Sequence, residues 1–241
     1  MQEVVYLPTQ NAYDLWAEIY DTNDNPLLVL DDIGLMKLLK PLLNSSDTIK
    51  TIADFGCGTG RQTFKLRTLF KNSFIYAFDL SENMLKKAQL RFDNIKEKNF
   101  RFQQMDFEKE NNNFFFLKNN VDLLVSTLII EHIKDLNLFV KKLKETLSPN
   151  GVAVLTMMHP AVFLRNSQAG FRDPETNQKI RPISFKYSIS DIVNSCIKNN
   201  FLVEELLEEE LDAAAMELEN EKMLRWAKYP LWFGIRLRNK P

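Results

Sequence analysis

The sequence of 241 residues has only two cysteines, Cys57 and Cys196, and only two histidines. Cys57 lies in a glycine-rich turn, so the two cysteines are poorly placed to form the disulfide framework of a small secreted domain. The N-terminus lacks the basic head and long apolar stretch of a secretory leader, and no run of about 18 or more apolar residues could span a membrane. We therefore expect a reduced, cytoplasmic protein without membrane segments.

An excess of charge is also missing. Lysine and arginine number 31, and aspartate and glutamate number 32, which gives a net charge of −1 and a pI near 6.2. A chain without surplus positive charge is poorly suited to neutralise a phosphate backbone, so the composition disfavours nucleic acid as the main partner. We identify no metal-binding motif, and the sequence leaves the oligomeric state open.

What the sequence does contain is the composition of a globular domain. Hydrophobic residues make up 45% and charged residues 26%, which are ordinary proportions for a chain that buries a sizeable core. The length fits one large domain. We expect a single domain over 1–241, with an N-terminal helical lid over 1–45 and two insertions on the substrate side, over 158–187 and 211–230.

A glycine-rich turn organises the chain. The apolar run 51–55 leads directly into Gly56, Gly58 and Gly60, and residues 61–70 then have helical spacing. Glycine has no Cβ, so the backbone of such a turn can approach a ligand closely. The helix that follows presents free N–H groups and a positive dipole end, which suit a carboxylate or phosphate. The pattern predicts a ligand-binding turn.

Apolar runs that predict strands alternate with helical segments through the middle of the chain. The expected strands are 51–55, 73–78, 100–104, 121–127 and 152–157, with helices at 61–70, from Ser81 onward and at 136–147. Such alternation predicts an α/β fold with a doubly wound, mostly parallel, Rossmann-like sheet and helices on both faces. Two later runs, 201–209 and 231–237, bring the sheet to seven strands.

Polar residues collect where these strands end. The glycine turn follows the first strand, Asp79 follows the second, Asp106 the third, and Ser126 and Thr127 close the fourth. In an open sheet of this kind the ligand binds outside the carboxyl ends of the strands, where the strand order reverses. Four separate strand ends therefore predict one site.

The N-terminal segment reads as two helices within residues 10–43. Asn25 and Pro26 have the form of a helix cap followed by a first-turn proline, and Pro41 should end the second helix or lie close to its end.

The segment after the fifth strand is harder to interpret. Residues 158–187 lack periodicity and predict an irregular insertion with a short hairpin near 173–179. Ser190 is the expected cap of the next helix, and residues 212–228 have helical character.

The spacing of the glycines bears on the ligand. A dinucleotide fingerprint reads G-x-G-x-x-G, whereas this turn reads G-x-G-x-G and has Arg61 where the third glycine would stand. This difference disfavours NAD and FAD without excluding them. The turn also lacks the G-x-x-x-x-G-K form of a phosphate loop.

Two motifs resemble those of the class I S-adenosylmethionine-dependent methyltransferases. Residues 54–60, Asp-Phe-Gly-Cys-Gly-Thr-Gly, look like the first motif of that family, and residues 79–88, Asp-Leu-Ser-Glu-Asn-Met-Leu-Lys-Lys-Ala, are similar to its second. Glu131-His132 and the two closing strands also match, and the resemblance implies that the last strand is antiparallel. It is strong over about residues 50–158 and extends in outline over the last forty. It says much about the cofactor and little about the methyl acceptor.

The resemblance implies S-adenosylmethionine as the cofactor. As in the family, Asp54 would organise the turn amides and the cationic amine, Asp79 would accept from both ribose hydroxyls, and Asp106 would accept from the adenine amine. Leu80 and Met84 would bracket the adenine. The cofactor contacts expected in this way are Tyr20, Asp54, Gly56, Cys57, Gly58, Gly60, Asp79, Leu80, Met84, Asp106, Phe107, Thr127 and Ile130.

Methyl transfer is a displacement in which positioning and desolvation can supply much of the catalysis. A general base is needed only if the acceptor carries a proton that must leave early. His159 follows the strand 152–157 at the edge of the site, and we expect it to be the base or an acceptor contact. His132 could equally pack at a helix start or act as a base, and Glu131 is the alternative base.

Aromatic side chains of the lid and the insertion are the expected acceptor contacts. Those we assign are Tyr13, Trp16, Phe163, Phe171 and Tyr187, with Met216 and Trp226 as further candidates. For Trp16, packing in the core is the competing interpretation. An aromatic lining suits a small planar or apolar molecule, so we predict O- or N-methylation of a small-molecule metabolite. The alternatives are a methyltransferase acting on protein or RNA and a non-catalytic cofactor-binding protein.

Overall fold

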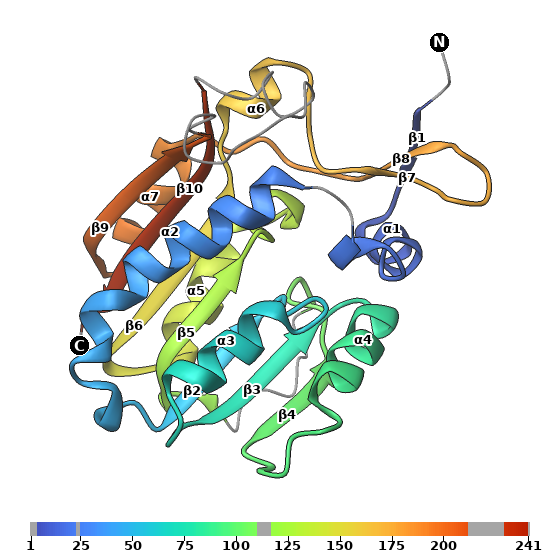
Figure 1. The fold of residues 1–241 in the computed structure, drawn as a ribbon. Coiled ribbons are helices and arrows are strands. Elements are labelled where there is room, and N and C mark those ends of the chain that lie inside the picture. The colour runs from blue at the N-terminus through green and yellow to red at the C-terminus, as the bar shows by residue number, and fades with distance from the viewer. Residues whose placement is uncertain (1–3, 23–24, 110–116, 212–228, 241) are drawn as a thin grey trace.

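The computed structural model describes residues 4–22, 25–109, 117–211 and 229–240. These residues form a seven-stranded sheet with helices on both faces and a small three-stranded sheet beside it (Figure 1). In the described part of the chain, no helix is both long enough and apolar enough to cross a bilayer.

The large sheet has the strand order β4-β3-β2-β5-β6-β10-β9. Its strands are β2 (Thr51–Phe55), β3 (Phe74–Asp79), β4 (Phe100–Gln104), β5 (Val121–Thr127), β6 (Leu147–Met158), β9 (Phe201–Glu210) and β10 (Pro230–Asn239). The first five strands in this order are parallel, and β10 is antiparallel to both of its neighbours. The predicted Rossmann-like sheet with an antiparallel last strand is confirmed.

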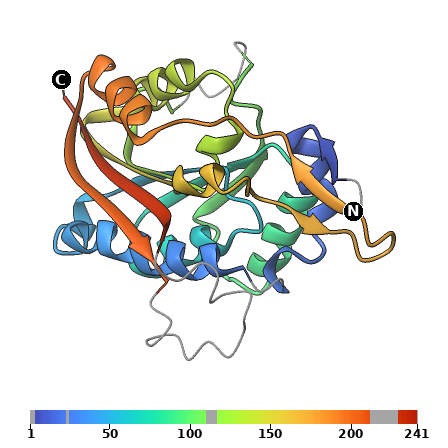
Figure 2. The same cartoon turned by 90° about the horizontal axis from the view of Figure 1, so that it is seen from above.

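Helices cover both faces of this sheet (Figure 2). On one face, Leu38 of α2 and Leu66 of α3 pack against the strands, whereas on the other Phe139 of α5 and Ile192 of α7 do so. The helices are α1 (Thr9–Trp16), α2 (Pro26–Leu43), α3 (Arg61–Leu69), α4 (Glu82–Phe92), α5 (Leu136–Thr146), α6 (Ala161–Leu164) and α7 (Ile189–Lys198), with short 3₁₀ turns η1 (Tyr20–Thr22), η2 (Ser46–Thr48) and η4 (Ile130–His132).

The predicted helix caps agree with the structure at α2 and differ from it at α7. The Asn25 side chain accepts from the Leu27 N–H and Pro26 opens α2, as predicted, while Pro41 lies two residues before the helix ends. The predicted cap Ser190 was wrong. Ser188 caps α7, because its hydroxyl accepts from the Asp191 N–H while the Asp191 carboxylate accepts from the Ser188 N–H in a reciprocal capping box.

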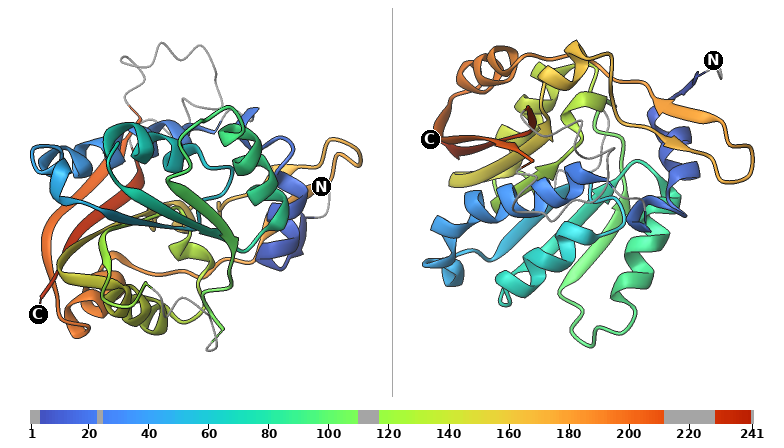
Figure 3. Two further views of the ribbon diagram at one scale, coloured as in Figure 1. Left: turned by 90° about the horizontal axis from the view of Figure 1, so that it is seen from below. Right: turned by 45° about the horizontal axis from the view of Figure 1, so that its top comes forward.

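The small sheet joins two distant parts of the chain. β1 (Val4–Leu7) pairs in parallel with β8 (Lys179–Pro182), which pairs antiparallel with β7 (Phe171–Arg172). The predicted hairpin near 173–179 is present as the β7–β8 pair, whereas β1 was not predicted. Figure 3 shows this sheet and α1 together at one end of the molecule. The N-terminal segment and the segment after β6 are thus joined through one small sheet.

Candidate active site

The glycine turn after β2 is held by backbone hydrogen bonds. The N–H groups of Gly56 and Cys57 both donate to the Phe78 carbonyl at 2.8 Å. Gly56 has φ +79°, and a Cβ there would lie 2.2 Å from Cγ2 of Ile129, so only glycine fits. Gly58 has φ +54°, and a Cβ there would meet no described atom within 4 Å. The backbone at Gly58 therefore borders open space.

That open space is a cavity of about 330 Å³ outside the carboxyl ends of the parallel strands. It lies where we predicted a ligand from the strand ends, beside the point at which the strand order reverses between β2 and β5. Its described lining is Pro8, Thr9, Gln10, Asn11, Tyr13, Tyr20, Gly56, Gly58, Asp79, Leu80, Ser81, Met84, Asp106, Phe107, Glu108, Thr127, Leu128, Ile129, His132 and Ile133.

Most of the predicted cofactor contacts are in this lining, but four are not. Asp54 is fully buried, Cys57 packs in a small cluster with Leu85, and a Cβ on Gly60 would come within 3.0 Å of Ala88, so these three residues face away from the cavity. Ile130 is fully buried in the main core instead of facing the cavity.

A turn at the end of β5 explains why Ile130 is buried in the core. Leu128 has φ +56°, a left-handed conformation that is rare for a branched side chain. After this turn, Leu128 and Ile129 line the cavity and Ile130 points into the core. The sequence also gave no indication that residues 8–11 of the lid line the same cavity.

Two carboxylates lie next to the turn, the half-buried Asp79 and the fully buried Asp54. Asp79 accepts the Gly58 N–H at 2.8 Å with Oδ2 and the Ser81 N–H at 2.8 Å with Oδ1. Burial raises the pKa of Asp79 to about 6, although these N–H groups oppose the rise. Asp54 accepts from the Thr63 hydroxyl at 2.6 Å, and burial raises its pKa to about 7. Oδ1 of Asp54 is buried and has no hydrogen-bond partner among the described residues.

His132 and Tyr13 meet at the lid side of the cavity. Nδ1 of His132 lies 3.2 Å from the Ile183 carbonyl, and Nε2 lies 2.9 Å from the Tyr13 hydroxyl. A carbonyl can only accept, so Nδ1 carries the proton and Nε2 accepts from Tyr13. Burial lowers the pKa of His132 to about 4 and raises that of Tyr13 well above its usual range. Both side chains are therefore neutral at physiological pH.

Glu131 lies next to this pair and is 1% exposed. Its Oε2 is buried without a hydrogen-bond partner among the described residues. Burial raises the pKa of Glu131 to about 7, against the lowering effect of the backbone N–H groups of Glu131 and Met158. The carboxylate also contributes to the raised pKa of Tyr13 and of Tyr20, both of which line the cavity. Glu131 is thus a buried acid with a pKa near neutral pH, and it is not among the described residues that line the cavity.

His159 has two structural partners. Its Nδ1 accepts the Ala161 N–H at 3.0 Å, so the proton lies on Nε2, which donates to Glu208 of β9 at 2.6 Å. The imidazole is 7% exposed and is not among the described residues that line the cavity. The strand-end argument placed His159 at the correct edge of the sheet, but its side chain is turned toward β9.

A second cavity, of about 220 Å³, lies between the start of α2, the insertion and β10. Its described lining is Trp16, Asn25, Pro26, Leu27, Met158, Val162, Ser167, Gln168, Ala169, Gly170 and Leu231. We call it the Trp16 cavity. Trp16 stacks on Phe171 with ring centroids 5.0 Å apart and meets Tyr20 edge-on at 5.2 Å.

The predicted acceptor contacts are divided between the two cavities and the core. Tyr13 lines the larger cavity and Trp16 the smaller, whereas Phe163 is buried in the core beneath α2. The Tyr187 hydroxyl donates to the carbonyls of Ile133 and Lys134 and lines neither cavity among the described residues. Met216 and Trp226 lie outside the described residues.

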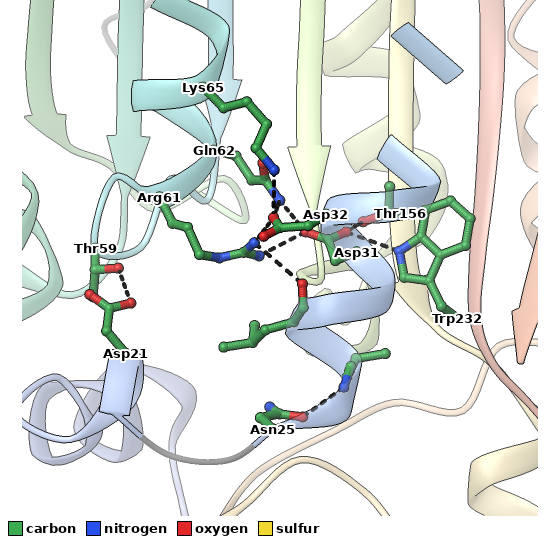
Figure 4. A network of polar contacts seen from close by, with 12 residues as sticks. Asp21, Asn25, Asp31, Asp32, Thr59, Arg61, Gln62, Lys65, Thr156 and Trp232 are labelled. Atoms are coloured by element: carbon green, nitrogen blue, oxygen red, sulfur yellow. Dashed lines mark hydrogen bonds and ion pairs between the residues drawn. The ribbon is translucent and has the colours of Figure 1, made fainter. Parts of the chain in front are cut away.

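A buried charge network fixes α2 beside the glycine turn (Figure 4). Asp31 is fully buried, and Arg61, the first residue of α3, donates to it at 2.9 Å. The Asp31 carboxylate also accepts from Gln62, Thr156 and Trp232, at 2.7, 2.7 and 3.0 Å. These donors come from α3, β6 and β10, so one carboxylate joins three elements to α2. The sequence prediction did not include this network.

Comparison with known proteins identifies the family. A model described as a methyltransferase domain matches residues 46–224, which is more than half of the chain. The chain belongs to the class I S-adenosylmethionine-dependent methyltransferases. The predicted family, the enzymatic nature of the protein and its cofactor are confirmed.

The methyltransferase has similar proteins in several organisms. It is 27% identical to an uncharacterized methyltransferase of Emericella nidulans, over 96% of this chain and 91% of that protein. It is 34% identical to malonyl-[acyl-carrier protein] O-methyltransferase 2 of Coxiella burnetii, over 48% of this chain and 44% of the relative. A solved S-adenosylmethionine-dependent methyltransferase of Clostridium acetobutylicum has the same fold, with a TM-score of 0.63, 18% identity and coverage of 95% of this chain and 99% of that one.

The residues of this methyltransferase fit the family's cofactor. The backbone at Gly58 borders the larger cavity, where a Cβ would occupy the open space. Each oxygen of Asp79 already accepts one N–H and retains a lone pair for a hydroxyl. Asp54 does not line the cavity as described, so the fit rests on Gly58 and Asp79. These groups offer glycine backbone and carboxylate acceptors, as the cofactor's amino acid and ribose require.

Proposed function

We propose that this methyltransferase transfers the methyl group of S-adenosylmethionine to an oxygen or nitrogen atom of a small-molecule metabolite. The observation that carries the proposal is the larger cavity, in which Gly58 and Asp79 of the sheet edge face Tyr13 and His132 beneath the lid. The groups assigned to the cofactor and the side chains of the N-terminal segment therefore border one cavity. The chain acts, in this proposal, as a single cytoplasmic domain whose lid and insertions select the acceptor.

The sheet edge supplies the cofactor's binding groups. Asp79 would hold the ribose hydroxyls, Leu80 and Met84 would flank the adenine, and Asp106 would accept from its amine. When bound, S-adenosylmethionine supplies an activated methyl group to the acceptor. The contribution of the chain is to orient the two molecules and exclude water, which the half-buried rings of Tyr13 and Tyr20 at the cavity support.

Glu131 is the candidate general base by its acidity, although its side chain is not among the described residues that line the larger cavity. A base must exist in its deprotonated form near the working pH, and the Glu131 pKa of about 7 meets this condition. Its unpartnered Oε2 is free of competing hydrogen bonds among the described residues. His132, with a pKa of about 4 and with Nε2 engaged by Tyr13, would instead hold the lid helix in place. His159 would brace β9 through Glu208.

The relatives support an oxygen acceptor over a nitrogen acceptor. The Coxiella burnetii relative is named an O-methyltransferase, and it matches this chain over 117 residues. A buried carboxylate base suits an acceptor such as a hydroxyl, whose proton must leave as the new bond forms. An amine would need no such base once it is neutral.

The decisive experiment separates cofactor binding from transfer. Titration calorimetry should show binding of S-adenosylmethionine to the wild-type chain, and Asp79→Asn should weaken it by about 1–3 kcal/mol because a charge-assisted acceptor is lost. Methyl-labelled cofactor should then label the small-molecule fraction of a cell extract and leave its protein and RNA fractions unlabelled. Label in protein or RNA would contradict the acceptor class, and binding without any transfer would leave only a cofactor-binding protein.

A further inference from the structure

Lys142 of α5 is buried, although lysine is normally a surface residue. It is 6% exposed and belongs to the buried stripe of the helix that also contains Phe139 and Leu143. A lysine is almost never buried this deeply unless its ammonium group has polar partners, because removing a charge from water is costly. The side chain of the neighbouring Lys141, by contrast, is 62% exposed. The burial of Lys142 must therefore be explained by its contacts.

The ammonium group of Lys142 donates to the loop that follows β4. Its Nζ lies 2.5 Å from the Phe107 carbonyl oxygen and 2.8 Å from the Lys109 carbonyl oxygen. The preceding strand β4 is at the edge of the large sheet, so only one other strand supports it. Hydrogen bonds from an ionised donor are shorter and roughly twice as strong as those between neutral groups. Lys142 thus ties the loop after an edge strand to α5.

The same loop forms one wall of the larger cavity. Asp106, Phe107 and Glu108 are all part of the described lining. The ring of Phe107 stacks on Phe55 of β2 with centroids 4.5 Å apart, and Oε1 of Glu108 accepts the Lys134 N–H at 2.5 Å just before α5 begins. The loop is therefore held by packing against the sheet and by hydrogen bonds from α5 and its approach, and its conformation shapes this wall.

One peptide group connects Lys142 with Asp106. The carbonyl of Phe107 and the N–H of Glu108 belong to the same planar peptide unit. The carbonyl accepts from Lys142, and the N–H donates to Oδ1 of Asp106 at 3.0 Å. A peptide plane that is held at its oxygen has the direction of its N–H fixed as well, and the cation polarises the group and strengthens the hydrogen bond of that N–H. Lys142 therefore acts on the orientation of the Asp106 carboxylate through this peptide group.

We propose that Lys142 is a positioning residue of the cofactor site, which holds the loop after β4 so that Asp106 is presented to the exocyclic amine of the adenine. This proposal rests on the proposed function, which assigns Asp106 to that amine. The ammonium group takes no part in methyl transfer, and its effect is on recognition of the base. A carboxylate held in this place accepts from the amine of adenine but opposes the carbonyl oxygen of hypoxanthine, so the site should reject an inosine analogue.

A matched pair of ligands measures this recognition. S-adenosylhomocysteine and S-inosylhomocysteine differ only in the base, since hypoxanthine has a carbonyl oxygen where adenine has its amine. Titration calorimetry on the full chain gives the ratio of the two affinities, and we expect the wild type to prefer the adenine compound by about tenfold or more. Lys142→Met keeps a side chain of similar length without the ammonium group and should reduce this preference by about threefold or more. Partial unfolding lowers both affinities by the same factor and leaves their ratio unchanged.

Two further variants separate this proposal from the proposed function. Lys141→Met makes the same chemical change at the exposed neighbour and should leave the preference at its wild-type value. Asp106→Ala removes the carboxylate and should bring the preference close to one. A preference that is lost in Asp106→Ala but unchanged in Lys142→Met would overturn the role given to Lys142 and leave the proposed function in place. A preference that survives in Asp106→Ala would refute the assignment of Asp106 to the adenine and, with it, the role of Lys142.

A measurement on the wild type decides the question if Lys142→Met does not fold. Coupling between two sites is reciprocal, so a lysine that favours adenine binding must itself be held more firmly when the adenine compound is bound. Acetylation with acetic anhydride, followed by peptide mass spectrometry, gives the modification rates of Lys142 and Lys141 in one sample. Saturating S-adenosylhomocysteine should slow the modification of Lys142 by about threefold or more and leave Lys141 unchanged, and S-inosylhomocysteine should protect Lys142 less. Equal rates for Lys142 with and without bound S-adenosylhomocysteine would overturn the proposal.

Discussion

Trp232 donates from its indole Nε1 to Oδ1 of Asp31 at 3.0 Å, across 201 positions of sequence. The ring of Trp232 is fully buried, and a Cβ on either Gly34 or Gly234 would lie within 2.5 Å of it. The two glycines leave room for the indole between α2 and β10, and Asp31 fixes its edge. The start of α2 is thereby held against the last strand of the sheet.

Asp31→Asn should destabilise the protein by about 3–5 kcal/mol. The substitution removes the buried negative charge that pairs with Arg61. It also places an amide N–H, itself a hydrogen-bond donor, against groups that donate to the carboxylate in the wild type. Asp32→Asn is the matched control, since Asp32 pairs with the same arginine but its side chain is 42% exposed. We expect a cost of at most about 1 kcal/mol there. Denaturant unfolding of both variants measures the difference, and similar midpoints for the two would contradict the central place given to Asp31.

Gly58→Ala should mainly weaken cofactor binding, whereas Gly60→Ala should mainly lower the stability of the fold. At Gly58 a Cβ meets no described atom, so the cost to stability is only the backbone strain of about 1 kcal/mol, while the methyl group occupies the cofactor cavity. At Gly60 a Cβ would lie 3.0 Å from Ala88, and the cost should rise to about 2–4 kcal/mol. Thermal unfolding and cofactor calorimetry test the pair. A Gly58→Ala protein with full cofactor affinity would remove this turn from the site.

His132 should remain neutral throughout the physiological pH range. Burial lowers its pKa to about 4, and an imidazole whose folded pKa is depressed costs stability only as the pH falls from about 6.5 toward 4. The sequence has two histidines, so nitrogen NMR resolves both, and His132→Asn assigns them. We expect the Nδ1–H tautomer, with no titration above about pH 5. A midpoint near 6.5 would show that the His132 ring is not enclosed as described.

Glu131→Gln should change how stability depends on pH. The folded pKa of about 7 lies above the ordinary glutamate value of about 4.5, so the stabilisation due to the protonated acid is complete below about pH 4.5 and is lost as the pH rises to 7. The neutral amide should avoid that loss, which corresponds to about 3 kcal/mol at most. Denaturant unfolding between pH 4.5 and 7.5 measures it against Glu82→Gln, an exposed control. Parallel curves for wild type and Glu131→Gln would exclude a strongly raised pKa.

The pattern of the sequence was sufficient for the large sheet. β2 to β6 are recognisable in the sequence as apolar runs between helical segments. Residues such as Asp79 and Thr127 then lie at one edge of the sheet, because the carboxyl ends of parallel strands meet there. The positions of side chains beyond a strand end are different, because they depend on turns that no periodicity reveals. The left-handed Leu128 sends Ile130 into the core, and His159 turns toward Glu208.

Contacts between distant segments were also beyond the sequence. β1 has only four residues and pairs with a strand about 175 positions away, so nothing local distinguishes it from a loop. Asp31 is one of two adjacent acids in α2, and only the position of Trp232 shows which of them is buried. The division into lid and insertions and the roles of individual site residues stay predictions.

The pairing of β1 with β8 has a consequence for how this enzyme can diversify. Ile183 donates its N–H to the Leu7 carbonyl and accepts from His132 with its own carbonyl, while His132 accepts from Tyr13 on the helix that follows β1. These contacts form a closed ring through the lid, the insertion and the sheet edge. A one-residue slip between β1 and β8 would reverse which side chains face inward. An insertion or deletion within β1 or β8 would therefore disturb the contacts of Ile183 and His132, whereas side-chain substitutions in these strands leave the backbone frame in place.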